Sequence, residues 1–423
     1  MKLLETLRRS ALAVSLAAGL AACGGGSGGD DDHHDEVRID TAGRLAIAEA
    51  GGSAVHVLDL DSGSVLQSFQ TQHPVSALYS SPGSRYALAI QRVQDLVQFV
   101  DGGLWQEDHV DHLHDYQQPP RLLGFSLAGP RPTHYEVHGV KAALFMDGHA
   151  DSGRNAEVLV FGDDDIGAAR IDARLALSLP MHGTAELRGQ YMLSTYREPQ
   201  AASTLPEQVE LYRREGSGYA FVQRFAEPCP GLHGSIVSGA YTLFGCTDGV
   251  LVVEQQGDAF SARKLANPSA LPEGGRIGSF VGAEGRANVV GIAGSRLFDI
   301  DPAAGTLTPI AWSEERTRRA QTFDGDGRHL LVLDDTGTVH LLDAEAGWQS
   351  RAALPAVSAM PSASPFPAIV ASKARDRVYV ADPAGHRIVV IDPARAVLDT
   401  PIGVSVSPTT LAWLGIAGHA HDH

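Results

Sequence analysis

Short apolar stretches that end in an acidic residue, an arginine or a glycine recur along the chain, about 40 to 60 residues apart. A second apolar stretch precedes each of them, and β-branched and aromatic residues are common in both, which favours strands. No helical periodicity of comparable length competes with this pattern. The eight recurring stretches are 55–59, 96–101, 158–162, 209–213, 250–254, 296–299, 339–343 and 388–392.

A repeat of this length with several strands per copy predicts an all-β fold, a β-propeller with eight blades, seven being the alternative. The innermost strand of a blade should come before the two strands already recognised, and only the first copy lacks such a strand. We therefore expect the C-terminal strand 409–414 to complete the first blade and close the ring, which removes free sheet edges. The expected inner strands are 75–79, 134–137, 182–187, 233–237, 278–281, 320–323 and 368–371.

The N-terminal segment has the pattern of an export signal: three basic residues, then an apolar run, then Leu20-Ala21-Ala22-Cys23. The last four residues look like a bacterial lipobox, so we expect residues 1–22 to be a lipoprotein signal peptide and Cys23 to carry lipid. A plain signal peptide is the alternative. Gly24 favours the outer membrane as the final location. Residues 23–36 read as a flexible Gly/Asp/His linker, 37–418 as the propeller and 419–423 as a His-rich tail.

The chain is acidic, with a formal net charge of −17. Removing residues 1–22 takes away three bases and one acid, which leaves −19. This charge argues against nucleic acid and anionic membrane surfaces as partners and suits cations. With Cys23 assigned to lipid, Cys229 and Cys246 remain, and in an exported protein we expect them to form a disulfide, with a thiolate zinc site as the alternative.

The densest polar cluster is the segment 107–116, EDHVDHLHDY. Imidazole and carboxylate are ready ligands of Zn²⁺, and in an extended segment His112 and His114 lie on one face. We predict a metal site that includes His109, Asp111, His112 and His114; a solvated acidic loop is the alternative. Copper or nickel would accept the same nitrogen ligands.

Histidines also stand at the start of three consecutive expected inner strands: His134, His182 and His233. A lone channel histidine is usually structural, but three on adjacent blades suggest a shared ligand site. Segment 107–116 is expected to lead from the second blade into the third. We therefore expect loop and strand histidines to converge at one end of the channel.

Together these motifs resemble the periplasmic zinc metallochaperones of the AztD type. The resemblance rests on the 108–114 loop, Pro132-Thr133-His134, His182-Gly183 and the runs 229–234 and 244–250, and it covers nearly the whole mature chain. It implies a β-propeller that hands Zn²⁺ to the substrate-binding protein of a zinc ABC importer, a zinc site built from loop and inner-strand histidines, and a Cys229–Cys246 disulfide. The family pattern is a soluble periplasmic protein, whereas Cys23 predicts an anchor.

Signature motifs for other chemistry are missing from the sequence, including a nucleophile elbow, an HExxH helix and a phosphate loop. We therefore expect no enzyme but a monomeric chaperone of the cell envelope, which binds Zn²⁺ and delivers it by ligand exchange. One alternative is a metal-dependent, lactonase-like hydrolase with Glu136 or Glu186 as general base. The other is a metal-free scaffold lipoprotein.

Overall fold

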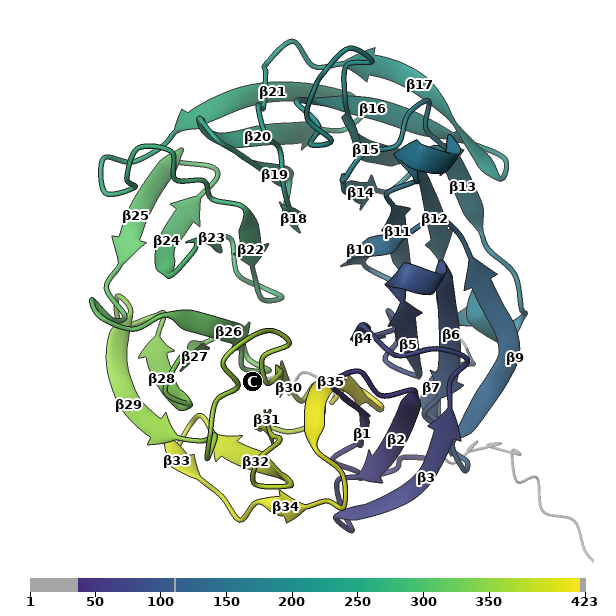
Figure 1. The fold of residues 1–423 in the computed structure, drawn as a ribbon, viewed down its shortest axis with the longest axis vertical. Coiled ribbons are helices and arrows are strands. Elements are labelled where there is room, and N and C mark those ends of the chain that lie inside the picture. Colours follow the sequence, from purple (N-terminus) through teal and green to yellow (C-terminus); the bar gives the residue numbers. More distant parts are fainter. Residues whose placement is uncertain (1–36, 110–111, 419–423) are drawn as a thin grey trace, which may run out of the picture. The chain divides into compact units, whose positions relative to one another are not determined.

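The computed structural model describes residues 37–109 and 112–418. Eight of the nine sheets in this part follow one another around a ring in chain order (Figure 1), and the ninth is a two-stranded hairpin. Helical structure in this part is limited to α1 (Asp163–Gly167) and the 3₁₀ turns η1 (Arg92–Gln94) and η2 (Ala150–Ser152). The prediction of an all-β propeller with eight blades, rather than seven, is confirmed.

Each blade is an antiparallel sheet that begins with an inner strand beside the channel and ends with an outer strand. In chain order, blades 2 to 4 contain β4 (Ala77–Ser80), β5 (Tyr86–Gln91), β6 (Leu96–Asp101) and β9 (Arg121–Ala128); β10 (Pro132–His138), β11 (Lys141–Met146), β12 (Glu157–Phe161) and β13 (Ala173–Ala176); and β14 (Ala185–Arg188), β15 (Tyr191–Tyr196), β16 (Gln208–Glu215) and β17 (Gly218–Arg224).

The next four blades repeat this plan, except that the last one has two short strands, both paired with its third strand, in place of one outer strand. They contain β18 (Ser235–Ser238), β19 (Tyr241–Cys246), β20 (Gly249–Gln256) and β21 (Ala259–Ala266); β22 (Ser279–Val281), β23 (Val289–Ala293), β24 (Arg296–Asp301) and β25 (Thr306–Ile310); β26 (Arg318–Phe323), β27 (His329–Asp334), β28 (Thr338–Asp343) and β29 (Gln349–Pro355); and β30 (Ile369–Ala371), β31 (Val378–Asp382), β32 (Arg387–Asp392), β33 (Val397–Leu398) and β34 (Ile402–Gly403).

Blade 1 joins the two ends of the described chain. Its inner strand is the last one, β35 (Pro408–Leu414), which pairs with β1 (Arg44–Glu49), followed by β2 (Ala54–Asp59) and β3 (Ser64–Gln70). Leu45 lies opposite Trp413, and Ile47 lies opposite Leu411. The predicted closure of the ring by the C-terminal strand is therefore confirmed.

The apolar positions recognised in the sequence fill the spaces between neighbouring blades. Blades 3 and 4, for example, pack through Phe145, Val158, Leu187, Met192 and Tyr212, all of which are buried. Sheets that pack face to face bury alternate residues of each strand, which fixes the register of every blade against the next. The inner strands are held in this way, so side chains at their starts have defined positions around the channel.

The segment 107–116 does not connect blades 2 and 3, contrary to expectation. It belongs to a hairpin of β7 (Leu104–Asp108) and β8 (Leu113–Gln117), inserted between β6 and β9, the third and fourth strands of blade 2. The hairpin therefore leaves the blade where β6 ends. Asp101 at that end pairs with Tyr86, the first residue of β5, and Arg85 lies over the Trp105 ring at 3.7 Å.

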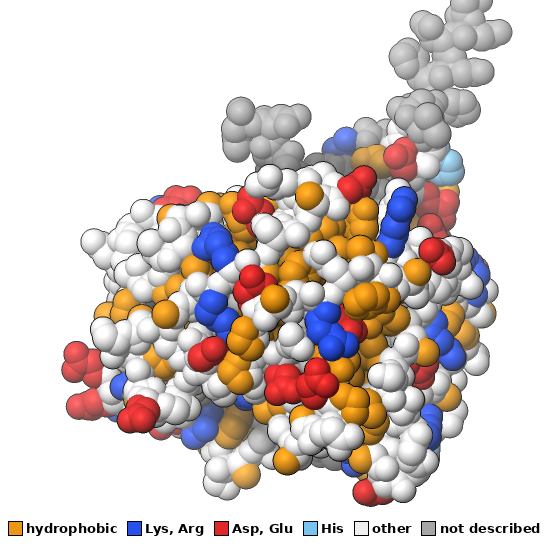
Figure 2. Space-filling view, turned by 90° about the horizontal axis from the view of Figure 1, so that it is seen from above, with side chains coloured by type: hydrophobic (Ala, Val, Ile, Leu, Met, Phe, Trp, Pro, Cys, Tyr) orange, Lys and Arg blue, Asp and Glu red, His pale blue; other side chains and the backbone are white. Residues whose placement is uncertain are grey.

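Cys229 and Cys246 are bonded to each other, as expected. None of the helices among the described residues is long and apolar enough to cross a membrane. On the side of the protein in Figure 2, acidic and basic side chains are interspersed among apolar ones. The predicted signal peptide, Cys23, the linker, Asp111 and the C-terminal tail lie outside the described residues.

Candidate metal centre

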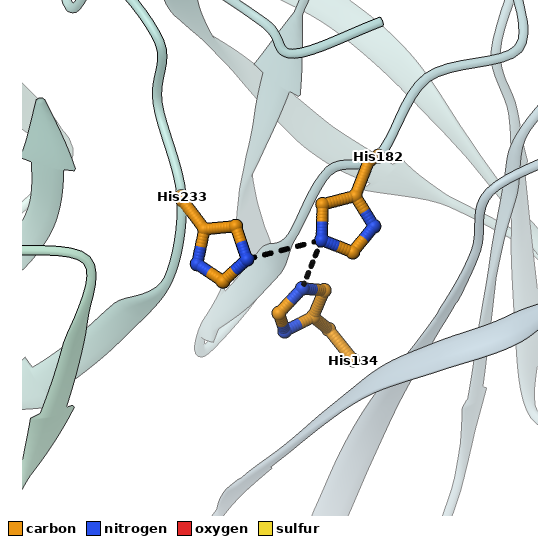
Figure 3. A group of neighbouring side chains, drawn as sticks. All are labelled: His134, His182 and His233. Carbon is orange, nitrogen blue, oxygen red and sulfur yellow. Dashed lines mark hydrogen bonds between the residues drawn. The ribbon is translucent and has the colours of Figure 1, made fainter. Parts of the chain in front are cut away.

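Three histidines from three consecutive blades meet at the end of the channel where the inner strands begin (Figure 3). His134 lies on β10, whereas His182 and His233 lie in the segments just before β14 and β18. Nε2 of His182 is 3.4 Å from Nε2 of His134 and 3.1 Å from Nε2 of His233. We refer to these three residues as the triad and to this end of the channel as the triad end.

The glycines that follow two of the histidines explain how the chain comes so close. A Cβ atom at Gly183 would lie 2.2 Å from Thr195 Oγ1, and one at Gly234 would lie 2.5 Å from the Gly278 carbonyl oxygen. Gly234 also has a φ of +71°, which side chains disfavour. The His-Gly pairs in the sequence are thus part of the geometry that brings the histidines together.

The ring nitrogens that face away from the cluster have partners of their own. Nδ1 of His182 lies 2.9 Å from Asp147 Oδ2, and Nδ1 of His233 lies 2.7 Å from the carbonyl oxygen of Gly278. An acceptor at Nδ1 fixes the tautomer in which Nδ1 donates its proton and Nε2 keeps a lone pair. In both rings, the atom directed into the cluster is therefore able to bind a metal.

Asp147 is the residue that sequence reasoning missed. It directly follows β11 and precedes Gly148, a pair of residues that is also typical of a turn. Its side chain is buried, and Oδ2 accepts a hydrogen bond from Arg92 at 2.8 Å as well as the one from His182. Carboxylates in this position orient a ligating imidazole and raise its basicity. Asp147 lies behind the His182 ring, so it positions that residue.

Burial favours the neutral form of two members of the triad. It lowers the pKa of His134 to about 4, with further lowering from His182 and His233. Burial also lowers the pKa of His233. Desolvation disfavours a charged imidazolium, and only the neutral imidazole binds a metal. The site therefore holds His134 in its ligand form at physiological pH.

The chemistry of this donor set fits a transition metal. The ligand atoms of the triad lie within 4.8 Å of one another, and Zn–N bonds of about 2.0 to 2.1 Å would place an ion between them. Within residues 37–109 and 112–418, no other His, Cys, Asp or Glu joins this group. Three protein nitrogens leave the fourth position of tetrahedral Zn²⁺ to an exchangeable ligand, which suits an ion that is to be passed on.

The predicted loop histidines are gathered separately. The rings of His109, His112 and His114 lie 5.3 to 6.3 Å apart, and Nε2 of His109 is 3.2 Å from the Tyr116 hydroxyl. We refer to these three as the hairpin histidines. Their hairpin leaves blade 2 beside the first residue of β5. The last residue of β5 is followed by Arg92, whose Nε donates a hydrogen bond to Thr133 Oγ1, next to His134 of the triad.

Loop and strand histidines therefore do not converge at one end of the channel. The hairpin begins beside one end of β5, a strand of six residues, and the triad lies beside the other. The two ends of β5 are five residue steps apart, and at about 3.3 Å per step this is roughly 16 Å.

Glu136 and Glu186, the suggested general bases, lie farther along β10 and β14 and do not belong to the triad group. Burial raises the pKa of both carboxyl groups, that of Glu186 to about 7.

We expect Asp147→Asn to weaken zinc binding by about 10- to 100-fold, the usual cost of losing such an orienting partner. The amide keeps the shape of the side chain but removes the charge that favours Nδ1–H of His182. Competition with a chelator of known affinity measures the effect. Asp151→Asn, in the same loop but exposed, is the matched control and should bind zinc like the wild type. Equal affinities of all three proteins would contradict the role of Asp147.

The chain resembles known proteins over most of its length. It is 26% identical over 392 residues to "Zinc chaperone AztD" of Citrobacter koseri, with 90% of each chain covered. A crystal structure of AztD from that organism superimposes with a TM-score of 0.76 at 25% identity, covering 89% of this chain and 99% of the other; the apo form gives 0.75 at 24%. The dihydro-heme d1 dehydrogenase NirN shares the fold alone, with a TM-score of 0.61 at 12% identity. No family model matches the sequence.

Proposed function

We propose that this protein is a zinc metallochaperone that binds Zn²⁺ at the triad and delivers it by ligand exchange. The observation that carries this proposal is the convergence of three imidazoles, two with Nδ1 held by an acceptor, on one point at the triad end. The similarity to a protein named zinc chaperone supports the choice of zinc and of delivery. No covalent chemistry is required of the site.

The exposure of the triad suits transfer rather than permanent storage. All three histidines are partly buried, and the side chain of His182 is 27% exposed. A structural zinc site is closed by four protein ligands, whereas an open position allows an incoming ligand to bind before another leaves. Histidines of an acceptor protein can then replace those of the triad one at a time.

We propose a second, weaker zinc site at the hairpin histidines. The three rings are near one another on an exposed hairpin, and Glu107 and Tyr116 lie beside them. The donor atoms here are less tightly grouped than in the triad, so more side-chain freedom is lost on binding. Such a site suits capture of metal from solution. Asp111, predicted as a further ligand, lies outside the described residues.

We further propose that the acceptor is the substrate-binding protein of a zinc ABC importer, and that the monomeric chaperone works in the periplasm. The pattern of the N-terminal sequence supports export and anchoring at Cys23, and Gly24 supports the outer membrane as the location. The acidic composition supports a partnership with cations rather than nucleic acid.

The test is zinc binding and transfer by a chain that lacks residues 24–35 and 419–423. We expect one zinc held at nanomolar strength or tighter, because the triad is untouched by the deletions. Transfer to the acceptor should accelerate as acceptor concentration rises, which distinguishes ligand exchange from release into solution. Loss of tight binding with the tails, or a transfer rate independent of acceptor, would contradict the proposal.

The metal-free protein should lose stability as the pH falls from about 6.5 to about 4. His134 takes up its proton near pH 4 in the folded state but near 6.5 when unfolded. Between these values the unfolded chain binds more protons, so the free energy of unfolding decreases. Urea denaturation at several pH values measures this, and His134→Asn should flatten the dependence. The same slope in both proteins would argue against a depressed pKa.

A further inference from the structure

A cluster of charged side chains joins blades 2 and 3 at the triad end. Its centre is Asp95, the residue that follows η1. Nε2 of His149 lies 2.8 and 2.9 Å from the two carboxylate oxygens of Asp95, and Nη1 of Arg154 donates to Oδ2 at 2.7 Å. His149 and Arg154 also exchange backbone hydrogen bonds across the loop that joins β11 to β12. We refer to these three residues as the clasp, because one carboxylate of blade 2 holds both sides of a loop of blade 3.

The loop that the clasp holds begins with Asp147, whose carboxylate lies 2.9 Å from Nδ1 of His182. His149 is two residues beyond Asp147 in the sequence. Asp95 is three residues beyond Arg92, which is the other side-chain partner of Asp147. The clasp and the Arg92–Asp147 ion pair therefore join the same two segments of chain at neighbouring points.

The backbone provides a direct connection between the clasp and Asp147. The amide of Arg131 donates to Asp95 Oδ1 at 3.0 Å, and the carbonyl oxygen of Arg131 accepts from the amide of Asp147 at 3.1 Å. Asp95 and Arg131 have φ angles of +57° and +58°, in the left-handed region that side chains disfavour. Such a conformation persists only where the surrounding contacts enforce it. Weaker contacts at Asp95 should therefore let this backbone relax and displace Asp147.

The clasp is more accessible than the residue that it holds. The side chains of Asp95 and Arg154 are 23% and 48% exposed, whereas that of Asp147 is 8% exposed. Burial opposes the ionisation of Asp95, but hydrogen bonds from His149 and from the Arg131 amide outweigh it and hold the pKa of Asp95 below its ordinary value. Asp95 therefore stays ionised at neutral pH, and its hydrogen bonds are of the stronger, charge-assisted kind.

We propose that Asp95, His149 and Arg154 position Asp147 behind His182 and thereby set how tightly the triad holds zinc. This inference rests on the proposed zinc function. A carboxylate orients a ligating imidazole only while it is itself held in place, so the residues around it contribute to metal affinity. Because the clasp is partly exposed, a partner that pairs with Asp95 would loosen Asp147 without touching the metal.

The first test compares the zinc affinity of Asp95→Asn with that of the wild type, by competition with a chelator, for the complete mature chain. The amide keeps the shape of the side chain but removes the charge that attracts His149 and Arg154. We expect zinc to bind about tenfold more weakly, at the lower end of the effect of losing an outer partner, because Arg92 still holds Asp147. Zinc should leave the variant for excess chelator faster than it leaves the wild type.

A double variant determines whether Asp95 acts through Asp147. In a protein that already carries Asp147→Asn, the further change Asp95→Asn should cost little additional affinity, because the effects of residues that share a partner do not add. The same loss of affinity in both backgrounds would contradict the proposal, since Asp95 would then act independently of Asp147.

Asp172→Asn is the matched control. Asp172 is 25% exposed and pairs with Arg214 at 3.1 Å and with Lys141 at 3.5 Å, beside the end of β11 that is remote from Asp147. Both single variants should lower the free energy of unfolding of the metal-free protein, measured with urea, but only Asp95→Asn should lower zinc affinity. Unchanged affinity in Asp95→Asn, or an equal loss in Asp172→Asn, would overturn this inference alone. Absence of tight zinc binding in the wild type would overturn the proposed function as well.

Discussion

Replacing His182 by alanine should weaken zinc binding by roughly a thousandfold, about 4 kcal/mol. His182 is the central member of the triad: its Nε2 lies beside both other histidines, and its Nδ1 is held by Asp147. Its loss leaves only two nitrogen ligands, His134 and His233, and Zn²⁺ rarely binds tightly with two protein ligands. Competition with a chelator, followed for the mature protein, measures the loss.

The hairpin provides a control with the same substitution. His114→Ala should leave the tight site intact and reduce only weaker binding, because the hairpin begins at the opposite end of β5 from the triad. Thermal unfolding of both metal-free variants would show whether the fold is preserved. If His114→Ala instead removed tight binding while His182→Ala did not, the main site would be at the hairpin and the present assignment would be wrong.

Removing the disulfide, by Cys229→Ser with Cys246→Ser, should lower the free energy of unfolding by about 3 kcal/mol. The bond closes a loop with a sequence separation of 17 residues, and both cysteines are fully buried. Loss of the cross-link allows the unfolded chain more conformations, which stabilises the unfolded state. Urea denaturation of the metal-free protein measures the effect, and reduced wild-type protein should match the variant.

The free energy of zinc binding should change less in this variant than the free energy of unfolding. The loop that leads from Cys229 to His233 has further anchors: the amide of Cys229 donates to Glu207, and that of Leu232 donates to Pro206. These bonds keep His233 near its place when the protein is folded. An unchanged free energy of unfolding would contradict the stabilising role, and complete loss of zinc binding would mean that the bond itself positions His233.

The fold was predictable because the same pattern of apolar strand residues and polar turn residues recurs in every blade. Each blade needs apolar strands of similar length with turns between them, so periodicity and strand propensity identify the strands together. The inner strands could be predicted because each one precedes the two recognised strands of its repeat. Their positions in turn placed His134, His182 and His233 beside the channel. The boundaries were less accurate: His182 and His233 precede β14 and β18 instead of starting them.

The position of the hairpin could not be predicted, because it depends on counting strands. Successive strands of a blade run in opposite directions, so a connection after the fourth strand leaves at the triad end and one after the third leaves at the other. Segment 107–116 comes after the third strand, β6, and β9 was not recognised as the fourth. Because β9 was not recognised, the hairpin histidines were predicted at the wrong end of the channel.

The role of Asp147 was hidden for a different reason. An aspartate followed by glycine after a strand has the composition of a turn, and the local sequence does not reveal which distant side chain it contacts. Its partner His182 lies 35 residues later, in the next blade. Only the packing of blades 3 and 4 brings them together, and this packing depends on many apolar residues at once.

The pairing of β1 with β35 sets an order of events for the folding of a chain that emerges N-terminus first. The first strand of the ring finds its partner only when the last strand of the chain is present. If the chain is exported N-terminus first, as we propose, the ring must stay open until nearly all of it has crossed the membrane. Such late, long-range closure is slow. The chain would therefore remain unfolded enough to be translocated, and the propeller would close only after translocation.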